Sequence, residues 1–120
     1  MKEYRLTEAE LKLADIIWDN EPVPSPELVK LCEAELNWKK STTYTMLKKL
    51  EKKEIFINSK GMVESLFTKE EFYAEQSKQI VNEGFGGSFP RFLAAFTRQK
   101  RLSDKEISEL QRLIDEHREG

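Results

Sequence analysis

The chain has 120 residues, of which 38% are hydrophobic and 35% are charged, and its formal net charge is −2. This length suits one domain, or a small domain with an appendage, and the composition is typical of a soluble, mostly helical protein. There is no apolar run near the ~20 residues that span a bilayer and no signal-peptide core, and the lone cysteine cannot form an internal disulfide. We therefore expect a cytoplasmic protein that makes no membrane contact.

The first predicted helix runs from about Glu8 to Asp19. Thr7 and Glu10 have the spacing of a capping box, in which each side chain hydrogen-bonds the backbone amide of the other residue. Apolar residues recur on one face of the segment, and Pro22 cannot continue the helix. Val23 lies between two prolines and is expected to form a short extended bridge.

A second helix is predicted to begin at Ser25-Pro26, because serine is a favourable N-cap and proline is favourable at the first helical position. Its apolar stripe consists of Leu28, Leu31, Cys32 and Leu36. Cys32 lies within that stripe, so we interpret it as a small core residue and not as a reactive thiol.

The third predicted helix, from about Lys40 to Glu54, separates apolar from basic side chains. At 100° per residue the apolar face holds Thr43, Met46, Leu47 and Leu50. The other side of the helix holds hydroxyl-bearing side chains followed by lysines: Ser41, Thr42, Tyr44, Thr45, Lys48, Lys49 and Lys52. The helix thus has one face for its own domain and one face for a partner.

Positive charge is concentrated in this part of the chain. Residues 38–69 carry eight basic and three acidic side chains and are net +5, whereas residues 1–37 are net −5 and residues 70–120 are net −2. Binding to a polyanion depends on local positive density and not on the net charge of the whole chain. Charge alone leaves open that the lysines form a solvated helix face.

A β-hairpin is predicted after the basic helix. Two β-prone runs, 55–58 and 62–67, are separated by Ser59-Lys60-Gly61, a tight turn in which glycine permits a positive φ. A second capping box, Thr68 with Glu71, follows the hairpin at once.

The remainder of the chain is predicted to form three helices. The first stops at the glycines of residues 84–87, the second restarts near Ser88, and the third begins at a capping box of Ser103 and Glu106. Large apolar residues recur on the last two helices: Phe89, Phe92, Leu93, Phe96, Ile107, Leu110, Leu113 and Ile114. Such short helices have little core of their own, so we expect these residues to form a dimer interface; the alternative is that they fold back onto the N-terminal domain.

The order of these elements is that of a winged helix-turn-helix. We therefore predict a mainly α fold with a small β-hairpin wing, in which residues 1–68 bind DNA and residues 69–120 form a helical dimerisation domain. Short donors near the start of the third helix suit base edges, and the longer cations suit phosphates. The predicted DNA-binding residues are Lys40, Ser41, Thr42, Tyr44, Thr45, Lys48, Lys49, Lys52 and Lys60.

The chain resembles the BlaI/MecI family of penicillinase and methicillin-resistance repressors and their copper-responsive relatives. The likeness covers nearly the whole chain and is carried by an ordered set of segments. These are residues 6–10 through Ile17-Trp18, Trp38 followed by residues 41–53, Gly87-Ser88-Phe89, and residues 102–110.

This resemblance implies a homodimer that blocks transcription, with each winged helix on one half of an operator dyad whose half-sites resemble TACA/TGTA. It also implies a sensor-linked protease as a partner. The bond that matches the family's usual Asn-Phe cleavage point is Ala95-Phe96 here. Glu54 stands where glycine usually ends the recognition helix, and Lys39-Lys40 replaces a common Ser-Pro opening.

No cofactor or metal is expected. The Cys-x-Cys pairs of the copper-responsive branch are missing, and one cysteine with one histidine cannot form a closed metal site in a single chain. His117 is interpreted as a solvated residue in the last turn of a helix.

The sequence leaves two alternative function classes to compare with DNA binding. A winged helix can dock an acidic protein through its lysines, but such a partner would not need the hydroxyl-bearing residues that precede them. An enzyme is disfavoured, because the sequence lacks a phosphate-binding loop after a strand and a convincing catalytic set.

Overall fold

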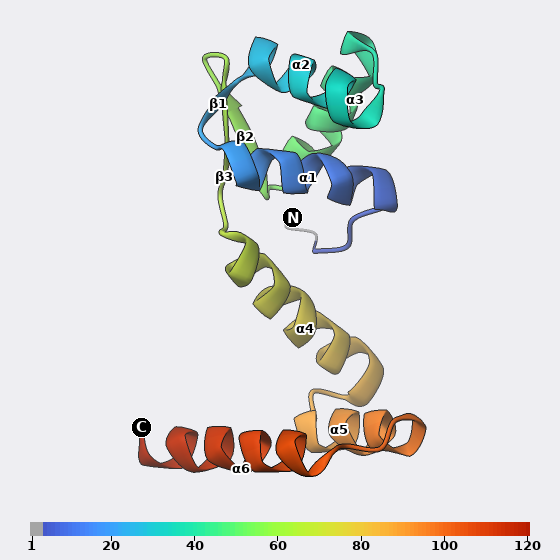
Figure 1. Cartoon of the computed structure of the whole chain (residues 1–120), viewed down its shortest axis with the longest axis vertical. Helices are drawn as coiled ribbons and strands as arrows, with labels where there is room; N and C mark the ends of the chain where they lie inside the picture. Colours follow the sequence, from blue (N-terminus) through green and yellow to red (C-terminus); the bar gives the residue numbers. More distant parts are fainter. Residues whose placement is uncertain (1–3) are drawn as a thin grey trace. The chain divides into compact units, whose positions relative to one another are not determined.

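A computed structural model describes residues 4–120 (Figure 1). The described residues form six helices and one three-stranded antiparallel sheet, which confirms the predicted fold class. Contacts divide the chain into two compact units, which we call the head, ending at Gln79, and the tail, Ile80–Gly120. Among the described helices none has the length and apolar character needed to cross a membrane.

Helix α1 (Glu8–Asn20) begins at the predicted capping box. The Thr7 hydroxyl accepts from the Glu10 amide at 3.2 Å, and the Glu10 carboxylate accepts from the Thr7 amide at 2.8 Å. The helix ends where Glu21 turns extended ahead of Pro22.

Helix α2 (Ser25–Leu36) differs from the prediction at its start. The assignment of Ser25 as N-cap is wrong, because Pro24 is the N-cap and Ser25 is the first helical residue. The reason is tertiary: the Ser25 amide donates to the Gly61 carbonyl at 2.8 Å, and the Ser25 hydroxyl accepts from Tyr44 at 3.3 Å. The hydroxyl is therefore engaged by another helix and does not cap its own.

Helix α3 (Lys40–Lys52) ends two residues before its predicted end. Lys53 is the C-cap, and Glu54 has a φ of 60°, the left-handed conformation that glycine adopts most readily. The Glu54 amide donates to the Glu51 carbonyl at 2.9 Å. The helix thus closes with a backbone geometry for which glutamate is an unusual residue.

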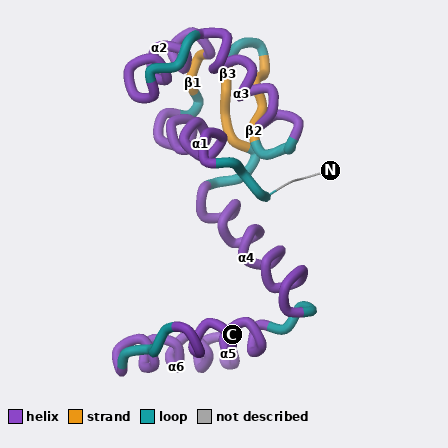
Figure 2. The backbone as a smooth tube through the Cα atoms, turned by 90° about the vertical axis from the view of Figure 1, so that its right-hand side faces the viewer, coloured by secondary structure: helices purple, strands orange, loops and turns teal. Residues whose placement is uncertain are grey.

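Strands β1 (Val23–Pro24), β2 (Phe56–Ser59) and β3 (Met62–Ser65) form the sheet in the order β1-β3-β2 (Figure 2). The predicted hairpin is present, but Ser59 belongs to β2, so the turn consists of Lys60 and Gly61 alone. The extended bridge predicted around Val23 is also a true strand, since Val23 pairs with Val63.

The core of the head combines residues that are distant in the sequence. Helices α1 to α3 and the hairpin supply Leu13, Ile17, Leu28, Cys32, Leu47, Leu50, Ile55, Phe56 and Val63. The Trp18 ring lies 5.2 Å from Phe56 and 5.4 Å from Phe72, measured between centroids, and its Nε1 donates to the Phe67 carbonyl at 3.0 Å. Phe72 is fully buried, although it comes from the next helix.

That helix, α4 (Lys69–Phe85), is continuous from the head into the tail. It begins at the predicted capping box, with the Thr68 amide 2.8 Å from the Glu71 carboxylate, and it stops at two glycines with positive φ. The boundary between the two units therefore falls inside α4, whereas the domain boundary expected from the sequence lies between residues 68 and 69. The difference arises because Phe72 packs into the head.

Helices α5 (Phe89–Gln99) and α6 (Asp104–Glu119) form the rest of the tail. Ser88 caps α5, with its hydroxyl 3.2 Å from the Arg91 amide, and Ser103 and Glu106 form the third predicted capping box. These two helices are described in full, and neither contains a buried residue.

Candidate nucleic-acid interface

One face of α3 is fixed against the head. Leu47, Leu50 and Thr43 are buried, and the Thr43 hydroxyl donates to the Lys39 carbonyl at 3.3 Å. Cys32 of α2 lies in the same core, where burial raises the pKa of its thiol above the ordinary value. This agrees with the interpretation of Cys32 as a core residue, because a buried thiol with a raised pKa carries little thiolate.

The opposite face of α3 is exposed along its length. Exposed side chains include seven of the predicted DNA-binding residues: Lys40, Ser41, Thr42, Thr45, Lys48, Lys49 and Lys52. The first turn contains no acidic residue and has no side-chain cap, so its backbone amides add to the positive potential of the lysines. The arrangement offers short donors at one end of the helix and long cations towards the other.

The lysines of residues 38–69 fall into two classes. Lys53 is paired with Glu10 and Lys69 with Asp15, each at 2.9 Å, so these two charges are balanced within the head. By contrast, Lys48 and Lys52 form no ion pair with any other described residue. The positive charge left for a ligand is therefore concentrated on the exposed face of α3.

Tyr44 differs from the other predicted DNA-binding residues. Its side chain is half-buried against the core, and its hydroxyl donates to Ser25 of α2 at 3.3 Å. Tyr44 thus links α3 to α2 in this structure and has its hydroxyl occupied.

The wing lies next to the start of α2. Lys60 and Gly61 have φ values of 52° and 81°, as a two-residue type I′ turn requires, and Lys60 is exposed. Since the Gly61 carbonyl accepts from Ser25, and Ser25 also contacts Tyr44, one residue joins the wing, α2 and α3. Ser25 therefore fixes the wing and α3, the two elements expected to face a duplex, relative to α2.

The predicted dimerisation residues are placed together on the tail. All eight are exposed or half-buried, and the exposed fractions of Phe89, Phe96 and Leu113 are 54%, 43% and 54%. Phe92 lies at the centre of an aromatic group, 5.5 Å from Phe85 and 6.0 Å from Phe89 between ring centroids. Side chains of this size are normally buried, so a single chain leaves this surface incomplete.

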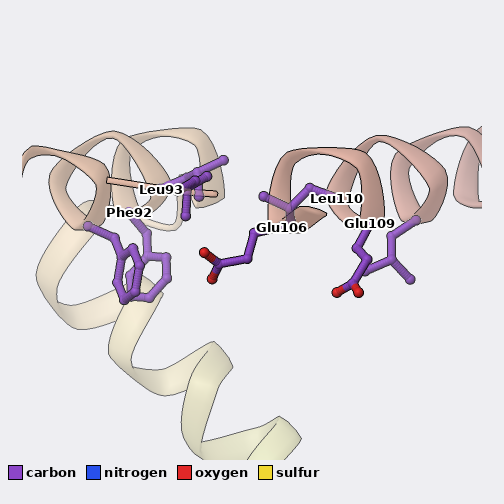
Figure 3. Close-up of a pocket in the computed structure, with 8 residues that line it drawn as sticks. Phe92, Leu93, Glu106, Glu109 and Leu110 are labelled. Atoms are coloured by element: carbon purple, nitrogen blue, oxygen red, sulfur yellow. The ribbon is translucent and has the colours of Figure 1, made fainter. Parts of the chain in front are cut away.

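A hollow of about 270 Å³ lies between α5 and α6 (Figure 3). Its lining is mainly apolar and comprises Phe92, Leu93, Phe96, Leu102, Glu106, Glu109, Leu110 and Leu113. The Glu106 side chain extends from α6 towards Phe92 (Figure 3). The hollow is therefore an apolar depression with the Glu106 and Glu109 carboxylates beside it.

The structure also places the predicted cleavage bond and His117. The Ala95–Phe96 bond lies inside α5, and His117 is exposed in the last turn of α6. In residues 4–120 no group of three or more histidine, cysteine, aspartate or glutamate side chains is arranged to hold a metal ion.

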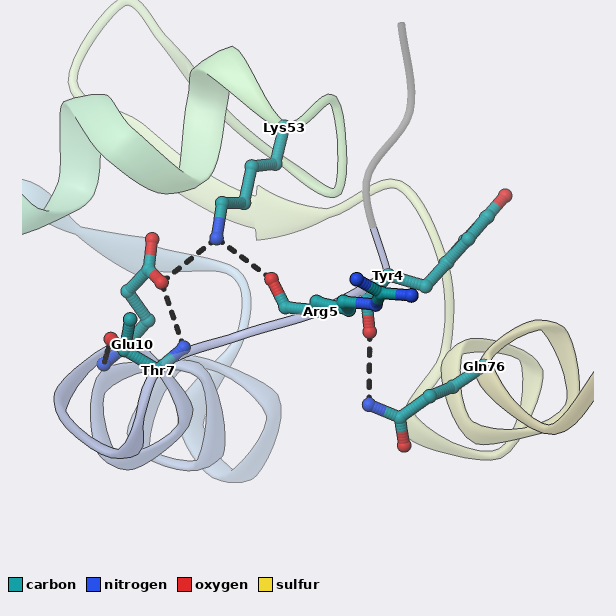
Figure 4. Close-up of polar contacts among 6 residues, drawn as sticks. All are labelled: Tyr4, Arg5, Thr7, Glu10, Lys53 and Gln76. Carbon is teal, nitrogen blue, oxygen red and sulfur yellow. Dashed lines mark hydrogen bonds and ion pairs between the residues drawn. The ribbon is translucent and has the colours of Figure 1, made fainter. Parts of the chain in front are cut away.

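Sequence reasoning missed the roles of Ser25 and Lys53. In the sequence Lys53 is only one of several positive charges, but in the structure its ammonium group binds Glu10, 43 residues away in the chain (Figure 4). The capping box marked Glu10, but local spacing carries no signal for a partner so distant. Ser25 was noticed as a cap, and the same hydroxyl serves a contact between helices.

Known proteins of one kind match nearly the whole chain. A family described as penicillinase repressor matches residues 6–116. The penicillinase repressor of Bacillus licheniformis is 25% identical, over 95% of this chain and 92% of its own length. The methicillin resistance regulatory protein MecI and the penicillinase repressor of Staphylococcus aureus are each 24% identical, covering 95% and 96% of this chain and 96% and 94% of their own lengths.

Proposed function

This chain belongs to the penicillinase repressor family, and we propose that it acts as a homodimer whose two heads bind the two halves of an operator dyad. It is a transcriptional repressor, as its relatives are named. Bound to an operator, the dimer would block transcription by occupying the DNA.

The observation that carries this proposal is the exposed face of α3. A helix that enters the major groove needs an apolar face for its own domain and an outer face with donors for base edges and cations for phosphates. Helix α3 has this division, and its lysines are not neutralised by other described residues. We assign Ser41, Thr42 and Thr45 to bases and nearby phosphates, and the lysines to the backbone.

The wing extends this surface. Lys60 stands on a turn that is hydrogen-bonded to the start of α2, and we infer that it contacts a phosphate or the adjacent groove. Tyr44 is assigned a weaker part in direct readout, because its hydroxyl already donates to Ser25.

The tail supports the dimeric part of the proposal. Neither α5 nor α6 buries a residue within one chain, and both present large apolar side chains around the hollow lined by Phe92 and Leu110. We propose that a second copy of the tail covers this surface. Such an isologous interface would place two heads at the high effective concentration that a dyad exploits.

The names of the relatives suggest the regulated genes. They refer to penicillinase and to methicillin resistance, and we infer that this repressor controls antibiotic-resistance or related stress genes in the cytoplasm, with no catalytic activity of its own. A sensor-linked protease is a further inferred partner. Because Ala95–Phe96 lies inside α5, that helix would have to unwind locally before cleavage.

The proposal is tested by selecting DNA fragments, genomic and randomised, on the purified full-length protein. We expect a dyad with half-sites about one helical turn apart, since two recognition helices then meet successive major grooves. If only sequence-independent binding is found, the repressor mechanism proposed here fails, and the lysine face is better explained by docking of an acidic protein.

A further inference from the structure

The polar face of α5 carries positive charge and no negative charge. Arg91 and Arg98 are seven residues apart, which is about two turns, so they lie on the same side of the helix. At 100° per residue that side is opposite Phe92 and Phe96, which belong to the proposed dimer surface. Both arginines are exposed, and neither forms an ion pair with another described residue. A dimer formed through the apolar face would leave these two charges unmatched.

A second hollow of the tail, of about 350 Å³, lies beside these arginines. Its volume is in the range of sites that bind small molecules. The hollow is formed entirely by residues of the tail, from the end of α4 and from α5: Gly84, Phe85, Gly86, Arg91, Ala94, Ala95 and Arg98. We call it the arginine hollow.

Small residues keep the arginine hollow open. Ala94 and Ala95 have no side-chain atoms beyond Cβ, so the surface of α5 between the two arginines stays low. Gly86 has a φ of 58°, which favours glycine, and a Cβ there would stand 3.8 Å from Nη1 of Arg91. The Arg91 guanidinium group therefore lies beside Gly86, at the edge of the hollow.

The charge around the arginine hollow has one sign. Among the described residues no carboxylate lines it. The sequence has no acidic residue between Glu83 and Asp104, and this stretch carries four basic residues: Arg91, Arg98, Lys100 and Arg101. A guanidinium group presents several N–H donors in a planar fork that matches a carboxylate or a phosphate. Two such groups beside one hollow therefore favour a ligand with two negative charges.

From these observations we propose that the arginine hollow binds a small molecule with an anionic group at each end. Arg91 holds one anionic group and Arg98 holds the other, while the apolar middle of the ligand lies over Ala94 and Ala95. The ligand class is a dicarboxylate or its phosphate-bearing counterpart, since both present the same pair of charges. This site is separate from the proposed DNA-binding face and from the proposed dimer surface, so it goes beyond the proposed function.

The test is a titration of the full-length protein at constant ionic strength, followed by the chemical shifts of its backbone amides. The probes are acetate, succinate, adipate, suberate and pyrophosphate. We expect shifts at Gly84, Gly86, Ala94 and Ala95. Suberate should bind about two- to fivefold more tightly than succinate, the range set by one exposed charge pair, because the two arginines are roughly 10 Å apart along the helix axis and only a long ligand reaches both. Acetate should bind most weakly.

Substitutions separate this site from the overall charge of the tail. Arg98→Gln should remove the preference for suberate over succinate and should weaken suberate binding about two- to fivefold. Arg101→Gln is the matched control, because it removes the same charge from an exposed arginine of the tail that does not line the arginine hollow. Ala94→Leu keeps both charges but fills the hollow, and it should also weaken suberate binding.

Three results would overturn the inference. The first is affinity that does not depend on the length of the dicarboxylate, and the second is equal weakening by Arg98→Gln and Arg101→Gln, since either would mean binding by overall charge. The third is sedimentation showing that Arg98→Gln weakens dimerisation while no probe binds, because the arginines would then serve the second copy. Tighter binding of pyrophosphate than of suberate, lost in Arg98→Gln, would support the site and assign phosphate to it. No DNA enters this titration, so its failure leaves the proposed repressor mechanism untouched.

Discussion

The head and the tail of this repressor differ in how many of their apolar side chains are buried within one chain. The head closes its core within one chain, where Trp18 lies between Phe56 and Phe72. The tail leaves Phe89 and Leu113 more than half exposed and buries no residue of α5 or α6. The core of the head is therefore complete within one chain, whereas we propose that the tail buries comparable side chains against a second copy.

The largest expected effect comes from separating the two units. A chain ending at Gln79 should remain folded and monomeric, because the core of the head is complete within it. Its affinity for the operator dyad should fall by ~10²–10⁴-fold, since the second head is no longer delivered at high effective concentration. Sedimentation and operator titration measure both quantities; equal affinity of the short and full-length chains would mean that the tail serves another purpose.

A shorter chain, ending at Thr68, sharpens the same test. It corresponds to the domain boundary expected from sequence, but it lacks Phe72, which is fully buried in the head. We expect it to melt well below the chain ending at Gln79. Identical melting of the two would contradict the assignment of the first turns of α4 to the head.

Two matched substitutions of phenylalanine then test the head and the tail separately. Phe72→Ala should destabilise the head by about 3–5 kcal/mol, because it removes a fully buried ring. Phe96→Ala, at a residue that is 43% exposed in one chain, should leave the unfolding of the head unchanged and should weaken dimerisation. Denaturant unfolding and sedimentation distinguish the two outcomes, and a stability loss in the head from Phe96→Ala would argue that the tail folds back onto it.

These comparisons show which parts of the structure were predictable. All three capping boxes were found from sequence, because each joins residues three apart, and so was the division of α3, because its period is local. The pairing of Val23 with Val63, the burial of Phe72 and the Lys53–Glu10 ion pair depend on residues that meet only in the folded chain. Local spacing contains no record of such contacts.

In the candidate site, too, local features were predictable and contacts between distant residues were not. Thr45 and Lys52 were placed on the outer face by helical period alone, and they are exposed there. The same period left Lys53 out of the predicted DNA-binding residues, but no local signal identified Glu10 as the partner of its ammonium group. In the same way, the helical period placed Tyr44 beside the predicted DNA-binding face, but the contact of its hydroxyl with Ser25 could be seen only in the structure.

The buried ion pair of the head, Glu10 with Lys53, should make its stability depend on pH. Burial alone would raise the pKa of Glu10, but hydrogen bonds from Lys53 and Thr7 outweigh it and hold that pKa below its ordinary value. The contribution of the pair is therefore fully present above the unfolded value of about 4.3 and is lost as the pH falls through the folded pKa. Glu10→Gln should cost about 1.5–3 kcal/mol at pH 7, and the difference from wild type should shrink in acid.

Substitutions on α3 should distinguish residues that set base preference from residues that contribute charge to binding. Thr45→Ala should relax preference at one base position by about 1–3 kcal/mol if the contact is direct. Lys52→Ala should weaken binding to all sequences and flatten the dependence of log K on log salt by roughly one phosphate contact per half-site. Lys69→Ala is the control, because Asp15 already balances that charge and the salt slope should not change. Indistinguishable effects of Thr45→Ala and Lys52→Ala on specificity would refute the division of this face.

The smallest expected effect lies in the wing, and it sets stability against binding at one residue. Lys60 has a φ of 52° in a turn whose two central residues both need positive φ, a conformation that costs an ordinary side chain roughly 1–2 kcal/mol and asparagine less. Lys60→Asn should therefore stabilise the head by a fraction of that amount. It should also lower operator affinity slightly and reduce the salt slope, because it removes a cation from the proposed DNA-binding surface. Thermal melting and salt titration of the same preparation measure both changes, and the tail, which the substitution does not touch, should keep its dimerisation constant. A loss of stability would mean that Lys60 makes a contact worth more than the strain of its backbone, and an unchanged salt slope would remove the wing from the DNA interface.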